Sequence, residues 1–258
     1  MTKQETKIKQ KTNSKLNNPI IQIKKLYKSF GKNEVLKGLD ITVNKGESLV
    51  VLGRSGSGKS IAIKCLVGLI KADKGEINVL GTDITKMNDI ELNNVRTKIG
   101  FLFQNGALYD SMSVRQNLAF TLKHHTKDLA AEEVNKRIVE ALENVGLEES
   151  IDKMPSELSG GMQKRIGLAR TLIINPEIIL YDEPTTGLDS ITSREISELI
   201  LSIQKKYKTT SIIITHDMAC AKMTSDRILI LKDGEINAEG TYEELEKSEE
   251  DWVKSFFV

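Results

Sequence analysis

The feature that most constrains this chain is a glycine-rich octapeptide, Gly53-Arg54-Ser55-Gly56-Ser57-Gly58-Lys59-Ser60. An apolar stretch, Ser48 to Leu52, precedes it, and a helical pattern from Ile61 to Leu69 follows. A strand, such a turn and a helix in this order form a P-loop, whose backbone N–H groups turn inward on phosphate. We predict that Lys59 bridges the outer phosphate oxygens and that the Ser60 hydroxyl coordinates Mg²⁺. The alternative is a glycine-rich structural turn, but the flanking elements favour the phosphate-binding loop.

A second segment ends in two adjacent carboxylates. Ile178 to Tyr181 is apolar and leads into Asp182 and Glu183, as in a Walker B strand. We predict that Asp182 holds the Mg²⁺ shell and that Glu183 polarises the attacking water as a general base. An acidic turn, which Pro184 would also suit, is the alternative. Beside a P-loop, the pair indicates ATP hydrolysis.

The pattern of apolar residues predicts a doubly wound α/β fold. Four stretches that do not alternate are typical of parallel strands covered on both faces: Ser48–Leu52, Glu177–Asp182, Ser211–Thr215 and Arg227–Leu231. Before the last two strands, apolar residues at helical spacing predict a crossover helix, namely Ile196, Leu199, Ile200 and Ile203. The turn Lys232-Asp233-Gly234-Glu235 predicts a hairpin.

Two further segments differ from this core. β-favouring stretches between Ile20 and Val51, broken by turn signals, predict a small antiparallel lobe. Residues from about 104 to 165 have a helical rather than a strand pattern and predict an inserted helical lobe. We therefore expect one domain over 19–240, a disordered basic tail over 1–18 and a C-terminal tail over 241–258.

Composition excludes several classes of protein. Lys and Arg total 37 against 36 Asp and Glu, and this net charge of +1 gives no sequence-wide attraction to nucleic acid, so we expect no nucleic-acid partner. The longest apolar runs fall far short of the roughly 20 residues that a membrane-spanning helix needs. Cys65 and Cys220 lie far apart in apolar segments, which favours buried thiols over a disulfide.

The segment Leu158-Ser159-Gly160-Gly161-Met162-Gln163 narrows the choice among P-loop proteins. It closely resembles the LSGGQ signature of ABC ATPases, with Met162 in place of the usual Gln. Ser159 can cap a helix whose first-turn glycines, Gly160 and Gly161, expose N–H groups to a γ-phosphate. The resemblance implies the ABC ATPase fold, which is a RecA-like core with both lobes. It also implies a head-to-tail dimer of two copies that holds two ATP molecules with Mg²⁺ at its interface.

Other marks of that family occur in order over residues 20 to 240. The resemblance implies that Gln104 is the Q-loop residue and a Mg²⁺ ligand, that Gly187-Leu188-Asp189 is the D-loop, and that His216 is the switch histidine. Phe30 matches the aromatic that stacks on adenine, and Tyr27 is the competing candidate. For His216, the alternative is a core histidine.

Three stretches resemble the ATPases of Mla and Mce type lipid transporters. They are Leu102 to Ser111, Glu157 to Arg165 and Tyr181 to Asp189. Asp110 is the most specific residue, because sugar and amino-acid importers commonly carry Pro there. The resemblance implies a separate transmembrane permease docked around Leu108 to Val114. It also implies an Mce-type substrate-binding protein and a location on the cytoplasmic face of the inner membrane.

Three alternatives stay open at this stage. The chain could energise an ABC transporter for another solute. It could be a non-transport ABC ATPase acting on nucleic acid or the ribosome, although those usually carry two cassettes or a coiled-coil insert. A scaffold without activity conflicts with the intact Lys59, Asp182, Glu183 and His216.

Overall fold

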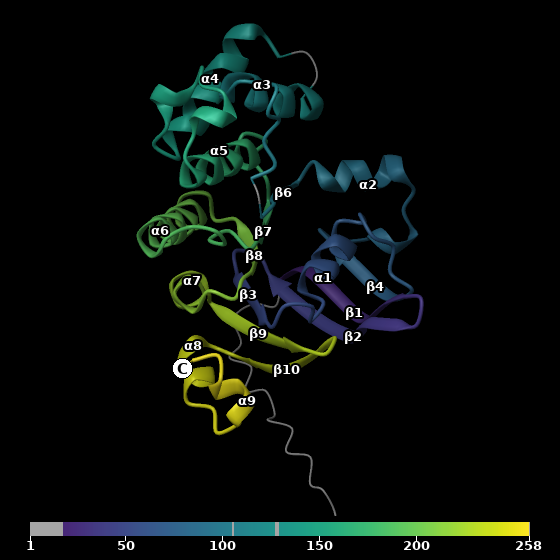
Figure 1. Ribbon diagram of the computed structural model, residues 1–258. Coiled ribbons are helices and arrows are strands. Elements are labelled where there is room, and N and C mark those ends of the chain that lie inside the picture. Colours follow the sequence, from purple (N-terminus) through teal and green to yellow (C-terminus); the bar gives the residue numbers. More distant parts are fainter. Residues whose placement is uncertain (1–17, 105, 127–128, 258) are drawn as a thin grey trace, which may run out of the picture.

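The computed structural model describes residues 18–104, 106–126 and 129–257, and its centre is a six-stranded sheet of order β10-β9-β3-β8-β7-β6 (Figure 1). The strands from β9 to β6 are parallel, and β10 pairs antiparallel with β9. Their bounds are β3 (Ser48–Gly53), β6 (Ile99–Leu102), β7 (Ile178–Asp182), β8 (Thr210–Ile214), β9 (Arg227–Lys232) and β10 (Glu235–Gly240). The four predicted parallel strands and the hairpin are confirmed. Strand β6, a short strand with Gly100 at its second position, was not predicted.

Alternate residues of β3 enter two separate cores. Val50 and Leu52 pack in one core with the helices of the upper part of Figure 1. Leu49 and Val51 pack in the other, against α1 (Lys59–Leu66) and the second sheet. Because side chains alternate across a strand, a strand buried on both faces must be apolar throughout. This explains why the sequence of β3 shows no alternation.

The second sheet is antiparallel and has the order β2-β1-β4-β5. Its strands are β1 (Pro19–Phe30), β2 (Asn33–Asn44), β4 (Lys74–Val79) and β5 (Thr82–Asp83). The predicted lobe over Ile20 to Val51 is therefore incomplete, because β4 and β5 come from beyond the P-loop. The pairing of Ile21 with Val79 joins residues far apart in the chain, and no local pattern indicates such a pair.

Helices cover both faces of the central sheet. The predicted crossover helix is α6 (Ser190–Tyr207), and it packs with α7 (Met218–Thr224) on the face opposite α1. Two short elements, η1 (Ile84–Lys86) and α2 (Asp89–Arg96), lead from the antiparallel sheet into β6.

A helical lobe is inserted between β6 and β7, at the top of Figure 1. It contains α3 (Val114–His125), α4 (Ala131–Glu143), the 3-10 turns η2 (Glu148–Ser150) and η3 (Pro155–Glu157), and α5 (Gly160–Leu172). The boundary expected near residue 165 falls inside α5, which continues to Leu172 because its second half packs on the central sheet through Leu168 and Leu172.

The segment after Gly240, expected as a tail, folds into α8 (Tyr242–Glu246) and α9 (Asp251–Lys254). Leu245 and Val253 are buried in the same core as β9, so this segment is part of the domain. The predicted basic tail lies outside the described residues except at Asn18. None of the described helices combines the length and apolar composition that a membrane crossing requires.

Candidate functional site

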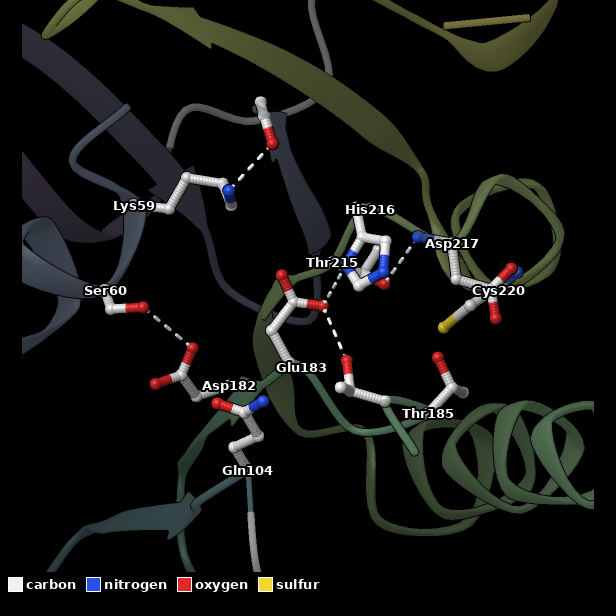
Figure 2. A network of polar contacts seen from close by, with 12 residues as sticks. Lys59, Ser60, Gln104, Asp182, Glu183, Thr185, Thr215, His216, Asp217 and Cys220 are labelled. Atoms are coloured by element: carbon white, nitrogen blue, oxygen red, sulfur yellow. Dashed lines mark hydrogen bonds and ion pairs between the residues drawn. The ribbon is translucent and has the colours of Figure 1, made fainter. Parts of the chain in front are cut away.

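The octapeptide lies where β3 ends and α1 begins. Lys59 is the first residue of α1 and is only 7% exposed. Its Nζ donates to the carbonyl oxygens of Gly53, at 2.7 Å, and Arg54, at 3.1 Å, so it folds back over the loop (Figure 2). Burial lowers the pKa of the Lys59 ammonium, and the nearby charges of Glu183 and Asp182 partly oppose this. The arrangement holds a cation beside the glycine-rich loop at the N-terminus of α1.

Two glycines give the loop its shape. A Cβ on Gly53 would lie 2.6 Å from both the Leu231 carbonyl oxygen and Ser57 Oγ, so the loop has no room for a side chain there. Gly58 has a φ of 102°, and a Cβ on it would lie 2.8 Å from Leu36. Arg54, Ser55 and Gly56 are exposed, whereas the Ser57 hydroxyl is buried and has no hydrogen-bond partner among the described residues. This open, glycine-lined turn at a helix N-terminus fits a polyphosphate.

Ser60, in the first turn of α1, lies against Asp182, the last residue of β7. Ser60 Oγ lies 3.1 Å from Asp182 Oδ1, although β3 and β7 are separated in the sheet by β8 (Figure 2). A hydroxyl and a carboxylate are hard oxygen donors of the kind Mg²⁺ takes, usually together with substrate phosphates and water. Among the described residues, no group of three or more His, Cys, Asp or Glu side chains could hold a metal by itself. The donor set fits a magnesium ion that arrives with a nucleotide.

Glu183 occupies the centre of a small polar network. His216 Nδ1 lies 2.8 Å from its Oε2 (Figure 2). The Thr186 hydroxyl donates to the same oxygen at 3.1 Å. The Glu183 side chain is 14% exposed and that of His216 is 65% exposed. The reading of His216 as a core histidine is therefore wrong. The Glu183 carboxylate is thus held by a histidine and a hydroxyl, beside Asp182, and a carboxylate in such a place is of the kind that can serve as a general base.

Gln104 follows β6 and is exposed in a turn. Figure 2 shows its side chain directed toward that of Asp182. No hydrogen bond joins the two in the described part of the chain. The prediction that Gln104 is a Mg²⁺ ligand stays a prediction.

The signature segment begins α5. Ser159 caps the helix by accepting a hydrogen bond from the Met162 N–H at 3.3 Å, as the sequence predicted. Ser159 and Gly160 are exposed. Gly161 is buried, and there is no room for a side chain on it, because a Cβ would lie 2.5 Å from Thr192 Cγ2. Within the described residues, no hydrogen bond joins this segment to the P-loop. Ser159 and Gly160 thus lie at the surface of the described structure, at the N-terminus of α5.

The two candidate adenine-stacking aromatics differ in their surroundings. Phe30, the last residue of β1, is 49% exposed, and Lys28 Nζ lies 5.3 Å from its ring centroid. Tyr27 is 41% exposed, and its ring covers Gly38, where a Cβ would lie 2.8 Å from the Tyr27 hydroxyl. Tyr27 therefore packs on β2, which leaves Phe30 as the better candidate.

Lys164 and Thr186 were not among the site residues predicted from the sequence. Lys164 is 6% exposed, and its Nζ donates to the backbone carbonyls of Gln104 and, at 3.3 Å, Glu183. A signal was available, because Lys164 stands on the same side of α5 as Gly161 and Leu168, which are buried. A lysine in such a position needs a polar partner inside the fold.

Comparison with known proteins identifies the family of this domain. Residues 36–186 match the family model described as ABC transporter. "Probable ribonucleotide transport ATP-binding protein mkl" from Mycobacterium leprae is 40% identical over 236 residues, covering 92% of this chain and 68% of that protein. "Protein TRIGALACTOSYLDIACYLGLYCEROL 3, chloroplastic" from Arabidopsis thaliana is 38% identical, covering 92% and 73%. "Methionine import ATP-binding protein MetN" from Rhizobium johnstonii is 38% identical, covering 91% and 64%. The chain spans about two thirds of the length of these relatives.

The same family appears among solved structures. A dimeric ATP-binding cassette in a post-hydrolysis state, bound to ADP and Pi, superposes with a TM-score of 0.79 at 33% identity, covering 86% of this chain and 98% of that one. The dimer and the bound ADP and Pi belong to that similar cassette.

Proposed function

This chain belongs to the ABC transporter family of ATP-binding proteins, and on that premise we propose that it energises the movement of phospholipid or a related lipid. The ATPase chemistry is carried by one observation: Glu183, paired with His216, stands next to Asp182, which contacts the P-loop residue Ser60. The groups that this copy would contribute to ATP hydrolysis thus lie near the carboxyl ends of β3, β7 and β8.

Each group in this site has a defined task in the proposed mechanism. The N–H groups of residues 53 to 60 and the Lys59 ammonium bind the phosphates, and the partial desolvation of Lys59 strengthens its attraction to them. Glu183 orients the attacking water and takes its proton, and His216 fixes the carboxylate. Ser60 and Asp182, with Gln104 at the edge of the site, would hold Mg²⁺, which neutralises charge on the phosphates when bound. Phe30 would stack on the adenine.

A second copy of the chain completes the site in this proposal. Ser159 and Gly160 are exposed at the start of α5, with N–H groups suited to a γ-phosphate. The dimeric structure of the similar cassette supports two copies. We assign Ser159, Gly160 and Gly161 to the nucleotide bound by the partner copy.

Replacing Glu183 with Gln tests the catalytic assignment. Gln keeps the size of the side chain but cannot take a proton, so turnover should fall by about 10²-fold or more while ATP still binds. Steady-state phosphate release and nucleotide binding by fluorescence titration measure the two quantities. ATPase activity near that of the wild type would refute the assignment of the general base.

The lipid cargo rests on sequence resemblance and on one relative's name. Asp110, Met162 and Tyr181 match the Mla and Mce type ATPases, and the Arabidopsis relative is named for trigalactosyldiacylglycerol, which is a lipid. The names of the other relatives refer to ribonucleotide transport and methionine import. Those names favour a second candidate, in which the same ATPase energises transport of a small polar solute.

The proposed partners are a transmembrane permease and an Mce-type binding protein, with this chain on the cytoplasmic face of the inner membrane. The loop from Leu108 to Val114 is the candidate permease contact. It is held rigidly, because the buried Asn117 side chain accepts from the Tyr109 N–H at 2.8 Å and donates to the Met112 carbonyl at 2.9 Å. Tyr109 itself is 45% exposed and packs against Phe120. A fixed loop that presents an aromatic side chain suits a docking partner.

The cargo is tested on the complex that copurifies with the tagged chain. We expect a permease to copurify, and we expect the ATPase activity of this complex in lipid nanodiscs to rise with phospholipid content. Ribonucleotides and methionine should leave the rate unchanged. Stimulation by either solute, without a response to phospholipid, would refute the lipid proposal and support the second candidate.

A further inference from the structure

Lys164 is a buried cation that the mechanism above does not use. Its side chain lies inside the domain at 6% exposure, and no carboxylate of the described residues forms an ion pair with it. Desolvation lowers the pKa of its ammonium, although Glu183 and Asp182 attract the charge and partly oppose this. Burying a charge without a counter-ion is costly. The cost of burying the Lys164 ammonium must therefore be offset by the groups that it contacts.

The contacts of Lys164 point to that reason. Its Nζ donates to two backbone carbonyls, that of Gln104 after β6 and that of Glu183 after β7. The three N–H donors of an ammonium can serve both acceptors at once. Lys164 thus ties α5 to the two loops that carry Gln104 and Glu183.

Glu183 needs such a restraint because its backbone is strained. Its φ is 52°, in the left-handed region that a residue with a side chain rarely adopts. Strained backbone persists only where surrounding contacts determine it. The Glu183 N–H is held by the Ile214 carbonyl at 2.9 Å, and its own carbonyl is held by Lys164. These two bonds fix both peptide groups from which the carboxylate projects toward His216.

We propose that Lys164 is a positioning residue for ATP hydrolysis, which holds Glu183 in its left-handed conformation through the Glu183 carbonyl. Without the ammonium, the peptide after Glu183 can rotate and the carboxylate leaves its place opposite His216. This inference rests on the proposed role of Glu183 as the general base. It predicts an effect on turnover rather than on ATP binding, because the contacts of Lys164 do not include the P-loop.

Arg170 supplies a matched control on the same helix. Its guanidinium donates to the carbonyls of Gly106, at 3.2 Å, and Ala107, so it ties the same loop after β6 to α5. Ala107 also has a positive φ, of 49°. Unlike Lys164, Arg170 makes no hydrogen bond to Glu183 within the described residues. It also lies over the Tyr109 ring, with 5.9 Å between its Cζ and the ring centroid, so the ATPase rate of the purified chain without permease is measured for both variants as well.

The test compares Lys164→Met with Arg170→Met in the purified, permease-bound complex. Met keeps the length of the side chain and removes the charge and its donors. For Lys164→Met we expect kcat to fall by about 10- to 100-fold, the scale of a catalytic group displaced by about 1 Å, with KM for ATP within about threefold. Arg170→Met should keep kcat within about threefold. Lys164→Gln, which retains a shorter neutral donor, should fall between Lys164→Met and the wild type.

A double-mutant cycle separates positioning from general structural damage. In the Glu183→Gln background, Lys164→Met should change the residual rate by less than about twofold, because the base that it positions is already absent. If the residual rate falls by the same factor as in the wild type, the proposal is wrong. It is also wrong if Lys164→Met keeps kcat within about threefold, or if Arg170→Met lowers kcat equally.

Two further results keep these outcomes distinct. Thermal unfolding of each variant shows whether it folds, and where Lys164→Met does not, Lys164→Leu, which also lacks a donor, takes its place under the same criteria. If Glu183→Gln retains wild-type turnover, the assignment of the base fails and the positioning role fails with it. If Glu183→Gln lowers turnover by about 10²-fold or more while Lys164→Met keeps kcat within about threefold, only the positioning role fails.

Discussion

Replacing Gly53 with Ala is expected to weaken both the fold and ATP binding, because the P-loop leaves no space for a methyl group at this position. A Cβ there would lie 2.6 Å from the Leu231 carbonyl oxygen and from Ser57 Oγ, where contacts under 3.0 Å are essentially never found. The serine hydroxyl can rotate away. The Leu231 carbonyl cannot, since it belongs to β9, which pairs with β3 through Gly53 itself.

The magnitude follows from this geometry. Overpacking by one methyl group against a fixed backbone costs about 1 to 3 kcal/mol. For a domain of this size, 1 kcal/mol corresponds to roughly 2 to 4 °C in Tm, so a fall of several degrees is expected. The Gly53 carbonyl also accepts a hydrogen bond from Lys59 Nζ at 2.7 Å, so a shift of Gly53 moves the phosphate-binding lysine. We therefore expect the affinity for ATP to fall at least about tenfold, which is about 1.4 kcal/mol.

Differential scanning calorimetry and ATP titration of the purified chain measure these two effects. Ser57→Ala is the matched control, because it removes a hydroxyl that has no hydrogen-bond partner in the described structure and should change Tm little. In Gly53→Ala/Ser57→Ala, only part of the lost stability should return, since the clash with Leu231 remains. The reasoning is refuted if Gly53→Ala keeps Tm within 1 °C, at about the 0.5 kcal/mol level of a neutral surface change, or if the double variant regains the full wild-type Tm.

Two other predictions concern the thiols and the adenine site. Burial raises the pKa of Cys65 and of Cys220 to about 11, so at pH 8 both thiols should resist iodoacetamide in the folded protein. Both should react once urea unfolds the protein, and mass spectrometry detects the alkylation. Alkylation of either cysteine in the native state would contradict their burial. Phe30→Ala should weaken ATP binding by about 1 to 3 kcal/mol, the value of a base–aromatic stack, with triphosphate binding unchanged. Tyr27→Ala is the control and should chiefly lower Tm, and the reverse pattern would assign the stack to Tyr27.

Much of the site could be predicted because each motif carries its own local context. The octapeptide from Gly53 to Ser60 stands between a strand and a helix, and the Ser159 cap begins a helix, as the sequence indicated. The strand ends that carry Asp182 and His216 were also placed within a residue, because buried parallel strands are recognisable as continuous apolar runs. Such signals depend only on neighbours along the chain.

Other parts could not be predicted because they depend on long-range contacts. Strand β6 is four residues long, and β4 joins the antiparallel sheet from beyond the P-loop. The segment from Tyr242 to Phe257 lies in the predicted C-terminal tail, yet its residues Leu245 and Val253 are buried in the core beside β9. Whether a short apolar segment folds is decided by the surface available to cover it.

The sequence alone thus determined the P-loop and the strand that ends in two carboxylates, because both motifs are patterns of residue types along the chain. Tertiary structure decided how these groups meet: that Ser60 reaches Asp182 across an intervening strand, and that His216 lies outside the core against Glu183. It also decided the place of Lys164. This lysine contacts the Gln104 and Glu183 carbonyls only because α5 packs against the ends of β6 and β7. The physical reason is that a motif fixes local backbone conformation, whereas the energy of a buried charge depends on which distant carbonyls surround it.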